Sequence, residues 1–347
     1  MNDEPIALEE WRQLFEAAIQ FKKQASWEWM EDKDYFAVTD PYTGEIGYCV
    51  TLGAGGMDYG LNVYLGQTAP LFLQEIRSDF DTFKGDSKEV MFSARAIYVN
   101  FEDRTKLDKK DLSLIRELGY KFRGSNEWPQ FRNYSPGFVP WSLTREEVRF
   151  LTVALEQAYE VADRFRQNDK LYFGHDEADE GIGEKRLHRV PRQTPEGIFW
   201  QDEWLPWRAE GSLIGPYTFP DELALRQCNK IKQSREVWQT DFDYAKVTIG
   251  GRGERPFYPR LCIWVDGKTS MIISAQLAEQ ADCREEYVRQ LIELLKTMNR
   301  KPARIEVGSV KAYYALKISA EQLSIPLRFH SRLDALLDAK EAINESF

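Results

Sequence analysis

Glycine is the most densely clustered residue in this sequence, and a glycine-rich loop is one way to bind a phosphate group. Seven of the 22 glycines fall within one short stretch: Gly44, Gly47, Gly53, Gly55, Gly56, Gly60 and Gly66. A Rossmann fingerprint requires G-x-G-x-x-G, but after Gly53 and Gly55 the third glycine position holds Asp58. A P-loop requires Gly-Lys-Ser/Thr at the start of a helix, whereas Gly56 leads into another predicted strand. We therefore predict turns and bulges of a twisted sheet, and keep close approach of Gly53, Gly55 and Gly56 to a ligand or a partner backbone as the alternative.

A basic and aromatic region stands out against an acidic background. It comprises Arg116, Lys121, Phe122, Arg123, Trp128, Phe131, Arg132, Tyr134, Trp141 and Arg145. Stacking rings beside cationic groups suit a nucleotide, a single strand or an acidic peptide. The candidate ligand contacts in this region are Arg123, Trp128, Arg132 and Trp141. The simpler interpretation, which we favour, places Trp128, Phe131 and Trp141 in the core and leaves the arginines solvated or paired with acids.

The sequence lacks the local signatures of common metal and catalytic sites. The three histidines are far apart and have no His-x-x-x-His or Cys-x-x-Cys companion: His175, His188 and His330. There is no Gly-x-Ser-x-Gly elbow, so we expect no metal, no cofactor and no recognisable nucleophile. The four scattered cysteines, Cys49, Cys228, Cys262 and Cys283, suit a reducing cytoplasm. Cys49 and Cys262 lie in apolar, strand-like runs and are predicted to be buried small hydrophobes.

Charge and hydropathy restrict the possible partners. The formal net charge is -10 and the pI is about 5.1, which disfavours general affinity for nucleic acid or an anionic membrane. No run of about 18 apolar residues is present for a membrane span. The first residues lack the positive region of a signal peptide. We expect a cytoplasmic protein whose partner is an unidentified protein or small molecule.

A chain of 347 residues exceeds what one hydrophobic core usually supports, so two domains are expected. Residues 1–168 are predicted to form an α+β domain with an antiparallel sheet, since an amphipathic helix over Leu8–Ile19 precedes several alternating runs. The strands are expected at Tyr35–Val38, Ile46–Leu52, Tyr59–Leu65 and Val90–Val99, and the helices at Pro70–Phe80, Asp108–Leu118 and after Thr144. Thr144 and Glu147 have the spacing of a capping box. The polar, acidic residues 169–195 are predicted to be a linker.

Residues 196–347 are predicted to form a second domain with a mixed α/β sheet. Edge strands are expected within Val237–Ile249. The following elements are strands at Pro259–Val265, Met271–Leu277, Arg304–Val307 and Leu327–Phe329, and helices at Glu285–Met298, Lys311–Leu323 and from Leu333. The predicted fold class of the whole chain is therefore α+β.

The order of these last elements resembles the ribonuclease H-like fold of nucleases and integrases. That resemblance is topological and covers roughly residues 244–347. In that family, carboxylates on the first strand, at the end of a later parallel strand and on a closing helix bind two metal ions for phosphoryl displacement. The resemblance gives Asp266, Glu306, Asp334 and Asp338 as candidate catalytic residues. Asp266 precedes Gly267, a pair more typical of a hairpin turn, and the second carboxylate position holds Gly308 and Ser309. A domain without catalytic activity is therefore favoured.

Other segments resemble an uncharacterised family of bacterial cytosolic proteins. These segments are Asp40–Tyr48, Tyr59–Gly66, and Lys121–Gly124 ahead of Trp128-Pro129. The part around Leu261–Leu337 resembles a second domain of unknown function that is often joined to the first. The resemblance implies a two-domain organisation and a bacterial origin, and it supplies no catalytic residues.

Three functional hypotheses follow from the sequence. The leading one is a non-enzymatic binding or regulatory protein, because the common catalytic signatures are missing. The enzymatic alternative is a metal-dependent nuclease or integrase-like activity in the second domain. In the third, the first domain captures a peptide strand or a nucleotide along its glycine-rich sheet edge.

Overall fold

The computed structural model describes residues 5–77, 93–168, 185–206, 214–251, 253–279 and 282–344. These residues divide into two compact units. Residues 5–77, 93–135, 140–168 and 185–206 form the N-terminal unit, and residues 136–139 and 214–344 belong to the C-terminal unit. The fold class is α+β, as predicted, because both units combine helices with a sheet.

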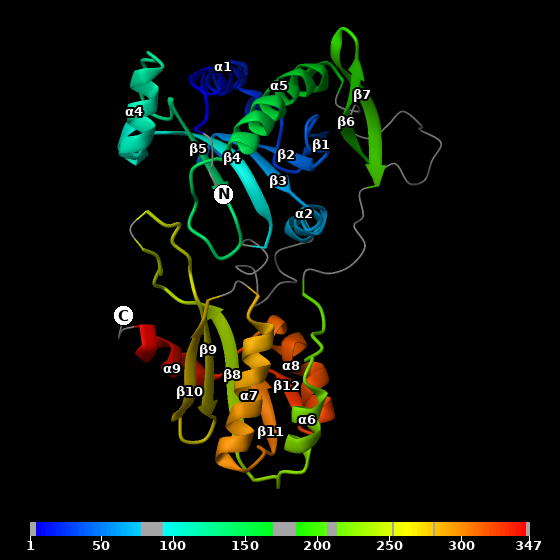
Figure 1. The fold of residues 1–347 in the computed structure, drawn as a ribbon, viewed down its shortest axis with the longest axis vertical. Coiled ribbons are helices and arrows are strands. Elements are labelled where there is room, and N and C mark those ends of the chain that lie inside the picture. Colours follow the sequence, from blue (N-terminus) through cyan, green and yellow to red (C-terminus); the bar gives the residue numbers. More distant parts are fainter. Residues whose placement is uncertain are drawn as a thin grey trace. The chain divides into compact units, whose positions relative to one another are not determined.

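The N-terminal unit is built on a seven-stranded sheet with the order β5-β4-β3-β2-β1-β6-β7 (Figure 1). The strands are β1 (Phe36–Thr39), β2 (Ile46–Leu52), β3 (Gly60–Leu65), β4 (Arg95–Glu102), β5 (Trp128–Tyr134), β6 (Lys185–Thr194) and β7 (Gly197–Pro206). Neighbouring strands are antiparallel except β1 and β6, which pair in parallel. The glycine-rich strands β2 and β3 therefore lie inside the sheet, and the hypothesis that a partner pairs with a glycine-rich sheet edge is wrong.

Helices α1 (Leu8–Gln24) and α5 (Arg145–Gln167) pack on each other, and α5 contacts β2, β3 and β4. Within the described residues this unit also has α2 (Ala69–Arg77) and α4 (Lys109–Glu117), with short 3-10 turns at Ser26–Glu28 and Arg104–Lys106. Leu14 and Phe15 of α1 join Leu151 and Leu155 of α5 in one buried core that includes Val63. Burial of these apolar stripes is what holds the helices on the sheet.

The first turn of α5 confirms the predicted capping box. The Thr144 hydroxyl accepts the backbone N–H of Glu147 at 3.3 Å, and the Glu147 carboxylate accepts the backbone N–H of Thr144 at 2.9 Å. Two N–H groups at the start of the helix, which have no partner within it, are thereby bonded.

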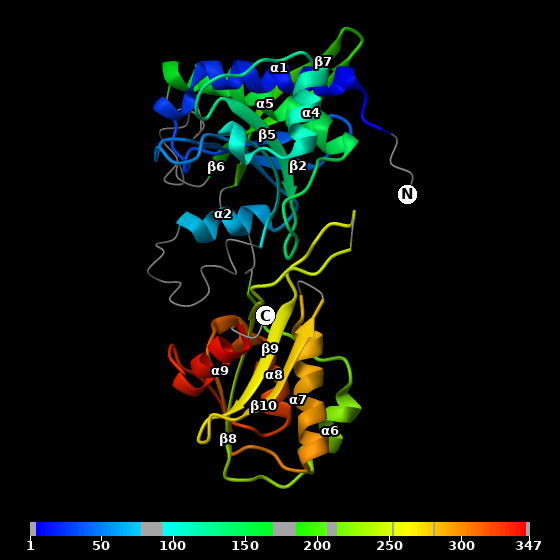
Figure 2. The same ribbon diagram turned by 90° about the vertical axis from the view of Figure 1, so that its left-hand side faces the viewer.

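The C-terminal unit is built on a five-stranded sheet with the order β10-β9-β8-β11-β12. Its strands are β8 (Val237–Tyr244), β9 (Arg260–Asp266), β10 (Ile272–Ala278), β11 (Arg304–Val307) and β12 (Leu327–Phe329). Strand β9 is antiparallel to both neighbours, whereas β11 pairs in parallel with β8 and with β12. The helices are α6 (Glu222–Asn229), α7 (Arg284–Met298), α8 (Val310–Gln322) and α9 (Asp334–Asn344). Helices α7 and α9 lie on opposite sides of these strands (Figure 2).

Two sequence-based boundaries need correction. Residues 169–184 of the predicted linker lie outside the described residues, but residues 185–194 form β6, and β7 also belongs to the N-terminal unit. The prediction of a linker over residues 185–194 was wrong because β6 pairs with both β1 and β7. The expectation of edge strands within residues 237–249 was also wrong, since β8 is the middle strand of its sheet.

Candidate functional site

Strand β8 carries two carboxylates on the face of the sheet that α9 covers. Alternate side chains of a strand point to opposite faces. Trp238 and Phe242 point toward α7, where Phe242 packs on Tyr287 with ring centroids 4.9 Å apart. Asp241 and Asp243 consequently share the opposite face.

Two lysines from later helices and the serine that precedes α8 complete what we call the β8 charge cluster: Asp241, Asp243, Ser309, Lys311 and Lys340. The Lys340 ammonium on α9 lies 2.7 Å from Oδ2 of Asp241 and 2.5 Å from Oδ2 of Asp243. The Lys311 ammonium on α8 lies 2.6 Å from Oδ1 of Asp243. The Ser309 hydroxyl donates to Oδ1 of Asp241 at 2.5 Å.

The charges in this cluster stabilise one another. Burial opposes ionisation of Asp243, but the ammonium groups of Lys311 and Lys340 outweigh it and lower the pKa of this carboxyl to about 2. Burial likewise opposes the charge on Lys340, and the two carboxylates outweigh it and raise the pKa of the ammonium. Asp241 is only 4% exposed, so its charge depends on these partners rather than on water.

The chain around Ser309 is shaped to fit the cluster. Ser309 is the residue before α8, and its hydroxyl also accepts the backbone N–H of Ala312 at 3.2 Å. A Cβ atom on Gly308 would lie 3.2 Å from Oδ2 of Asp241 and 3.3 Å from Leu336 of α9. Gly308 therefore lets α9 approach β8 closely enough for Lys340 to reach both carboxylates.

Three of the four carboxylates suggested by the sequence, Asp266, Glu306 and Asp334, have separate partners. Asp266 accepts the N–H groups of Lys268 and Thr269 within its own turn. Glu306 on β11 accepts the side-chain amide of Gln239 at 3.1 Å and the guanidinium of Arg304 at 2.8 Å.

The remaining two lie on α9. Asp334 is exposed and pairs with Arg332, and Asp338 is exposed. Across the described ranges, no three His, Cys, Asp or Glu side chains are grouped so that they could hold a metal ion. Asp266, Glu306, Asp334 and Asp338 are therefore not brought together as a metal-binding group.

The β8 charge cluster was missed because its members are far apart in the sequence. Asp241 and Asp243 are 99 and 97 residues from Lys340. The available signal was local: two carboxylates two residues apart in one strand must share one face. Because that strand was expected at a sheet edge, where carboxylates face water, its two carboxylates were not considered as a buried pair.

The glycine loop of the N-terminal unit makes a turn. Gly56 donates its N–H to the carbonyl of Gly53 at 2.9 Å. Gly53 has a φ of +139°, and a Cβ there would lie 2.6 Å from the ring of Trp27. Gly55 and Gly56 have no atom within 4 Å of the corresponding position. The close approach at Gly53 is thus to a side chain of the same unit.

The basic and aromatic candidates have different surroundings. Arg132 donates to Asp111 at 2.8 and 2.6 Å and to Asp108 at 3.1 Å, so its charge is paired. Trp128 and Trp141 are partly buried, and Arg123 is exposed.

The four cysteines are free and buried. Cys49 is 0% and Cys262 is 2% exposed, which confirms their prediction as buried small residues. Burial raises the pKa of the Cys49 thiol, so this thiol is unreactive at neutral pH. Among the helices of the described ranges, none has the length and apolar character needed to cross a membrane.

One solved structure resembles part of the chain. It is a chain from the cryo-EM structure of the simian T-cell lymphotropic virus intasome in complex with PP2A regulatory subunit B56 gamma, 20% identical, with a TM-score of 0.25. The match covers 33% of this chain and 40% of that chain. No curated protein matches the chain.

Two family matches cover most of the sequence. Residues 11–186, about half of the chain, match the domain of unknown function DUF7309. Residues 224–344 match the domain of unknown function DUF6930. These matches confirm the expectation of an N-terminal and a C-terminal domain that both lack an assigned function. The chain is therefore a member of the DUF7309 family and carries a DUF6930 domain in its C-terminal unit.

Proposed function

We propose that this protein is a non-enzymatic binding or regulatory protein, and that its C-terminal unit is a ribonuclease H-like domain whose metal position is filled by lysine side chains. The observation that carries the proposal is the pairing of carboxylates with ammonium groups in the β8 charge cluster.

The strand order supports the fold assignment. The family resemblance was drawn from antiparallel strands followed by alternating helices and strands. The observed strand order is β10-β9-β8-β11-β12. Strand β9 is antiparallel to both neighbours, and helices follow β10, β11 and β12. The same pattern therefore holds when β8 is counted as part of the ribonuclease H-like fold. On this basis β8, rather than residues 259–265, corresponds to the first strand.

The side chains at the three expected carboxylate positions support the absence of catalysis. The first strand has Asp241 and Asp243, but the end of β11 leads to Ser309 and the closing helix α9 presents Lys340. An ammonium group has no lone pair with which to coordinate a metal ion. Two of the three positions therefore lack a carboxylate.

The charge balance points the same way. Two carboxylates face two ammonium groups, so the cluster has no surplus negative charge with which to attract a divalent cation. A metal ion would have to displace Lys340 from Asp241, a nearly buried pair whose separation is unfavourable. The alternative of metal-dependent phosphoryl transfer has no comparable support.

Calorimetry with MnCl2 on the full chain tests this proposal. We expect no saturable heat from the wild-type protein at millimolar Mn²⁺, because Lys340 already neutralises the carboxylates. Lys340→Gln frees one negative charge and should gain weak Mn²⁺ binding, whereas the control Lys317→Gln, also a lysine of a C-terminal helix, should not. Saturable binding to the wild type that Asp241→Asn weakens, together with Mn²⁺-dependent cleavage of nucleic acid, would overturn the proposal.

A bacterial, cytoplasmic setting is the accompanying proposal. The sequence resemblance supports it, and so do four free, buried cysteines, which a reducing compartment maintains. The net charge of -10 favours a protein or small-molecule partner over nucleic acid. Thiol titration of unfolded protein purified without reductant should count four thiols; a count of two would contradict the reducing setting.

A further inference from the structure

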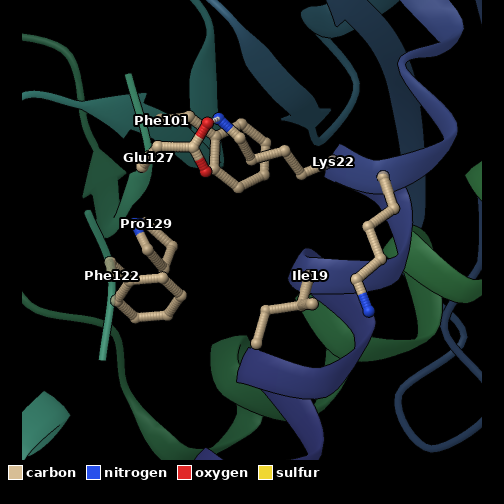
Figure 3. A pocket seen from close by; sticks show the side chains of 7 residues that line it. Ile19, Lys22, Phe101, Phe122, Glu127 and Pro129 are labelled. Carbon is tan, nitrogen blue, oxygen red and sulfur yellow. Dashed lines mark ion pairs between the residues drawn. The ribbon is translucent and has the colours of Figure 1, made fainter. Parts of the chain in front are cut away.

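The N-terminal unit contains a cavity of about 380 Å³ between α1 and the segment that leads into β5. We call it the α1 cavity. Its lining consists of Ile19, Lys22, Lys23, Phe101, Phe122, Glu127 and Pro129. Ile19 faces Phe122 and Pro129 across the opening, and Lys22 reaches toward Glu127 near Phe101 (Figure 3). The volume falls in the range of small-molecule sites, about 300–1,000 Å³.

The walls of the cavity are fixed by contacts within the unit. The ring of Phe122 packs on Tyr120 and Trp128, with ring centroids 5.9 and 5.7 Å away. The loop before β5 is held where Asn126 donates its N–H to Asp103 at 3.0 Å and accepts a hydrogen bond from Lys22. A cavity whose walls are already ordered binds a ligand at a lower entropic cost.

Two kinds of chemistry meet in the lining. Ile19, Phe122 and Pro129 offer apolar contact surface. Lys22 lies 3.0 Å from Glu127 and 5.1 Å above the ring of Phe101, so its side chain is held in place.

Lys23 adds a second ammonium, which is exposed. Two cations and one anion leave the lining with a surplus positive charge, in a protein whose net charge is -10. An ammonium has three N–H donors. Among the described residues, Asn126 and Glu127 take two of those on Lys22, which leaves one for a ligand.

We propose that the α1 cavity binds a small aromatic carboxylate. The ring packs between Ile19 and the wall formed by Phe122 and Pro129, and the carboxylate accepts from Lys22 and is attracted by Lys23. A neutral ligand of the same shape would fill the same volume but would not pair with the surplus positive charge of the lining, so the carboxylate is preferred. This inference concerns the N-terminal unit and does not rest on the function proposed for the C-terminal one.

Calorimetry on the full chain with 2-naphthoate as the probe, and with neutral 2-naphthamide for comparison, tests the inference. We expect saturable binding of 2-naphthoate with a dissociation constant near the millimolar range, and at least threefold weaker binding of the amide, the effect of one exposed charge contact of about 0.7 kcal/mol. Absence of saturable heat with 2-naphthoate, or equal affinity for the two probes, would overturn it.

Variants locate the binding. Lys23→Gln should weaken 2-naphthoate binding about threefold, whereas Lys109→Gln, an exposed lysine outside the cavity lining, should leave it unchanged. Ile19→Trp fills the cavity and should abolish binding while the circular dichroism spectrum stays unchanged. Equal losses in the two lysine variants, or full binding by a folded Ile19→Trp protein, would refute the assignment. Mn²⁺ titrations do not report on this cavity, so the two proposals fail independently.

Discussion

Inner strands of the two sheets carry different kinds of residue. In the seven-stranded sheet, β3 has Gly60 at a point where a Cβ would lie 2.0 Å from the carbonyl oxygen of Val99. In the five-stranded sheet, β8 has two carboxylates, and later helices supply their counter-charges. Clustered glycines and paired carboxylates are both residue types that ligand sites use. The glycine instead permits close packing of strands, and the carboxylates are neutralised within their own unit.

The difference shows what a binding site needs beyond the right residue types. Once the chain has folded, a binding site must still have an open volume and charged or polar groups that other residues have not neutralised. The β8 charge cluster leaves neither, since its carboxylates already have two ammonium partners. The α1 cavity leaves both, because its lining encloses about 380 Å³ and carries one more cation than anion.

The largest effect is expected from Asp241→Ala, which tests whether the β8 charge cluster stabilises the C-terminal unit. This change leaves Lys340 without one of its two carboxylates and removes the acceptor of Ser309, so we expect the free energy of unfolding of the C-terminal unit to fall by about 3 kcal/mol. Urea unfolding measured by near-ultraviolet circular dichroism would show it. Asp334→Ala, which removes an exposed carboxylate, should change almost nothing. Equal effects of the two variants would mean that the β8 charge cluster does not stabilise the C-terminal unit.

The matching test of the seven-stranded sheet is Gly60→Ala. The new methyl group would press on the backbone of β4, which cannot move without breaking the pairing of Gly60 with Asn100, so we expect a loss of about 2 kcal/mol in the free energy of unfolding. Gly55→Ala is the matched control, because nothing lies within 4 Å of its Cβ position. If both variants are equally stable, the clustered glycines are not there for packing.

Much of the fold could be predicted because its signals are local. The apolar stripe of α1, the capping box at Thr144 and the continuous apolar run of β9 each depend only on neighbouring residues, and each is present. Strand β6 could not be predicted in this way. Its polar sequence is typical of a linker, but Arg189 is buried there, where it donates to Gln157 of α5 at 3.0 Å and to Glu160 at 2.7 Å. Such partners become visible only after folding.

The candidate site was less predictable than the fold for a related reason. The resemblance to a ribonuclease H-like fold led to Asp266 because the strand expected at residues 259–265 was taken as the first strand of that fold. Whether a carboxylate binds a metal or a lysine depends on which side chain α9 brings to it. Lys340 and Asp241 are 99 residues apart, so no local sequence pattern indicates their contact, and it becomes visible only in the folded topology.

Acid should affect the N-terminal unit before the C-terminal one. His188 is 5% exposed, its Nε2 lies 2.6 Å from the Thr39 hydroxyl, and burial lowers its pKa. Below about pH 6.5 the unfolded chain therefore binds a proton that the folded chain does not, and the free energy of unfolding falls as the pH decreases. We expect a loss of about 1 kcal/mol between pH 7 and pH 5.

Urea unfolding at several pH values would measure this loss. His188→Gln should flatten the dependence, and His330→Gln, a change at an exposed histidine, should preserve it. A profile that stays equally steep in His188→Gln would assign the acid sensitivity to other groups.

The smallest expected effect is on the titration of Asp243. Its lowered pKa means that the stabilisation it provides is complete above about pH 4 and is lost as the pH falls toward 2, so the cluster should not respond to pH in the range where His188 does. In Lys340→Met, one of the two ammonium groups is absent, and the pKa of Asp243 should rise from about 2 toward its ordinary value of 3.8. Carboxyl NMR would follow both proteins. The pKa of Asp282, lowered by its hydrogen bond from Arg284, serves as the control because it should not change. An unchanged pKa of Asp243 would mean that Lys311 alone keeps this carboxyl ionised, and that Lys340 is not the group that neutralises it.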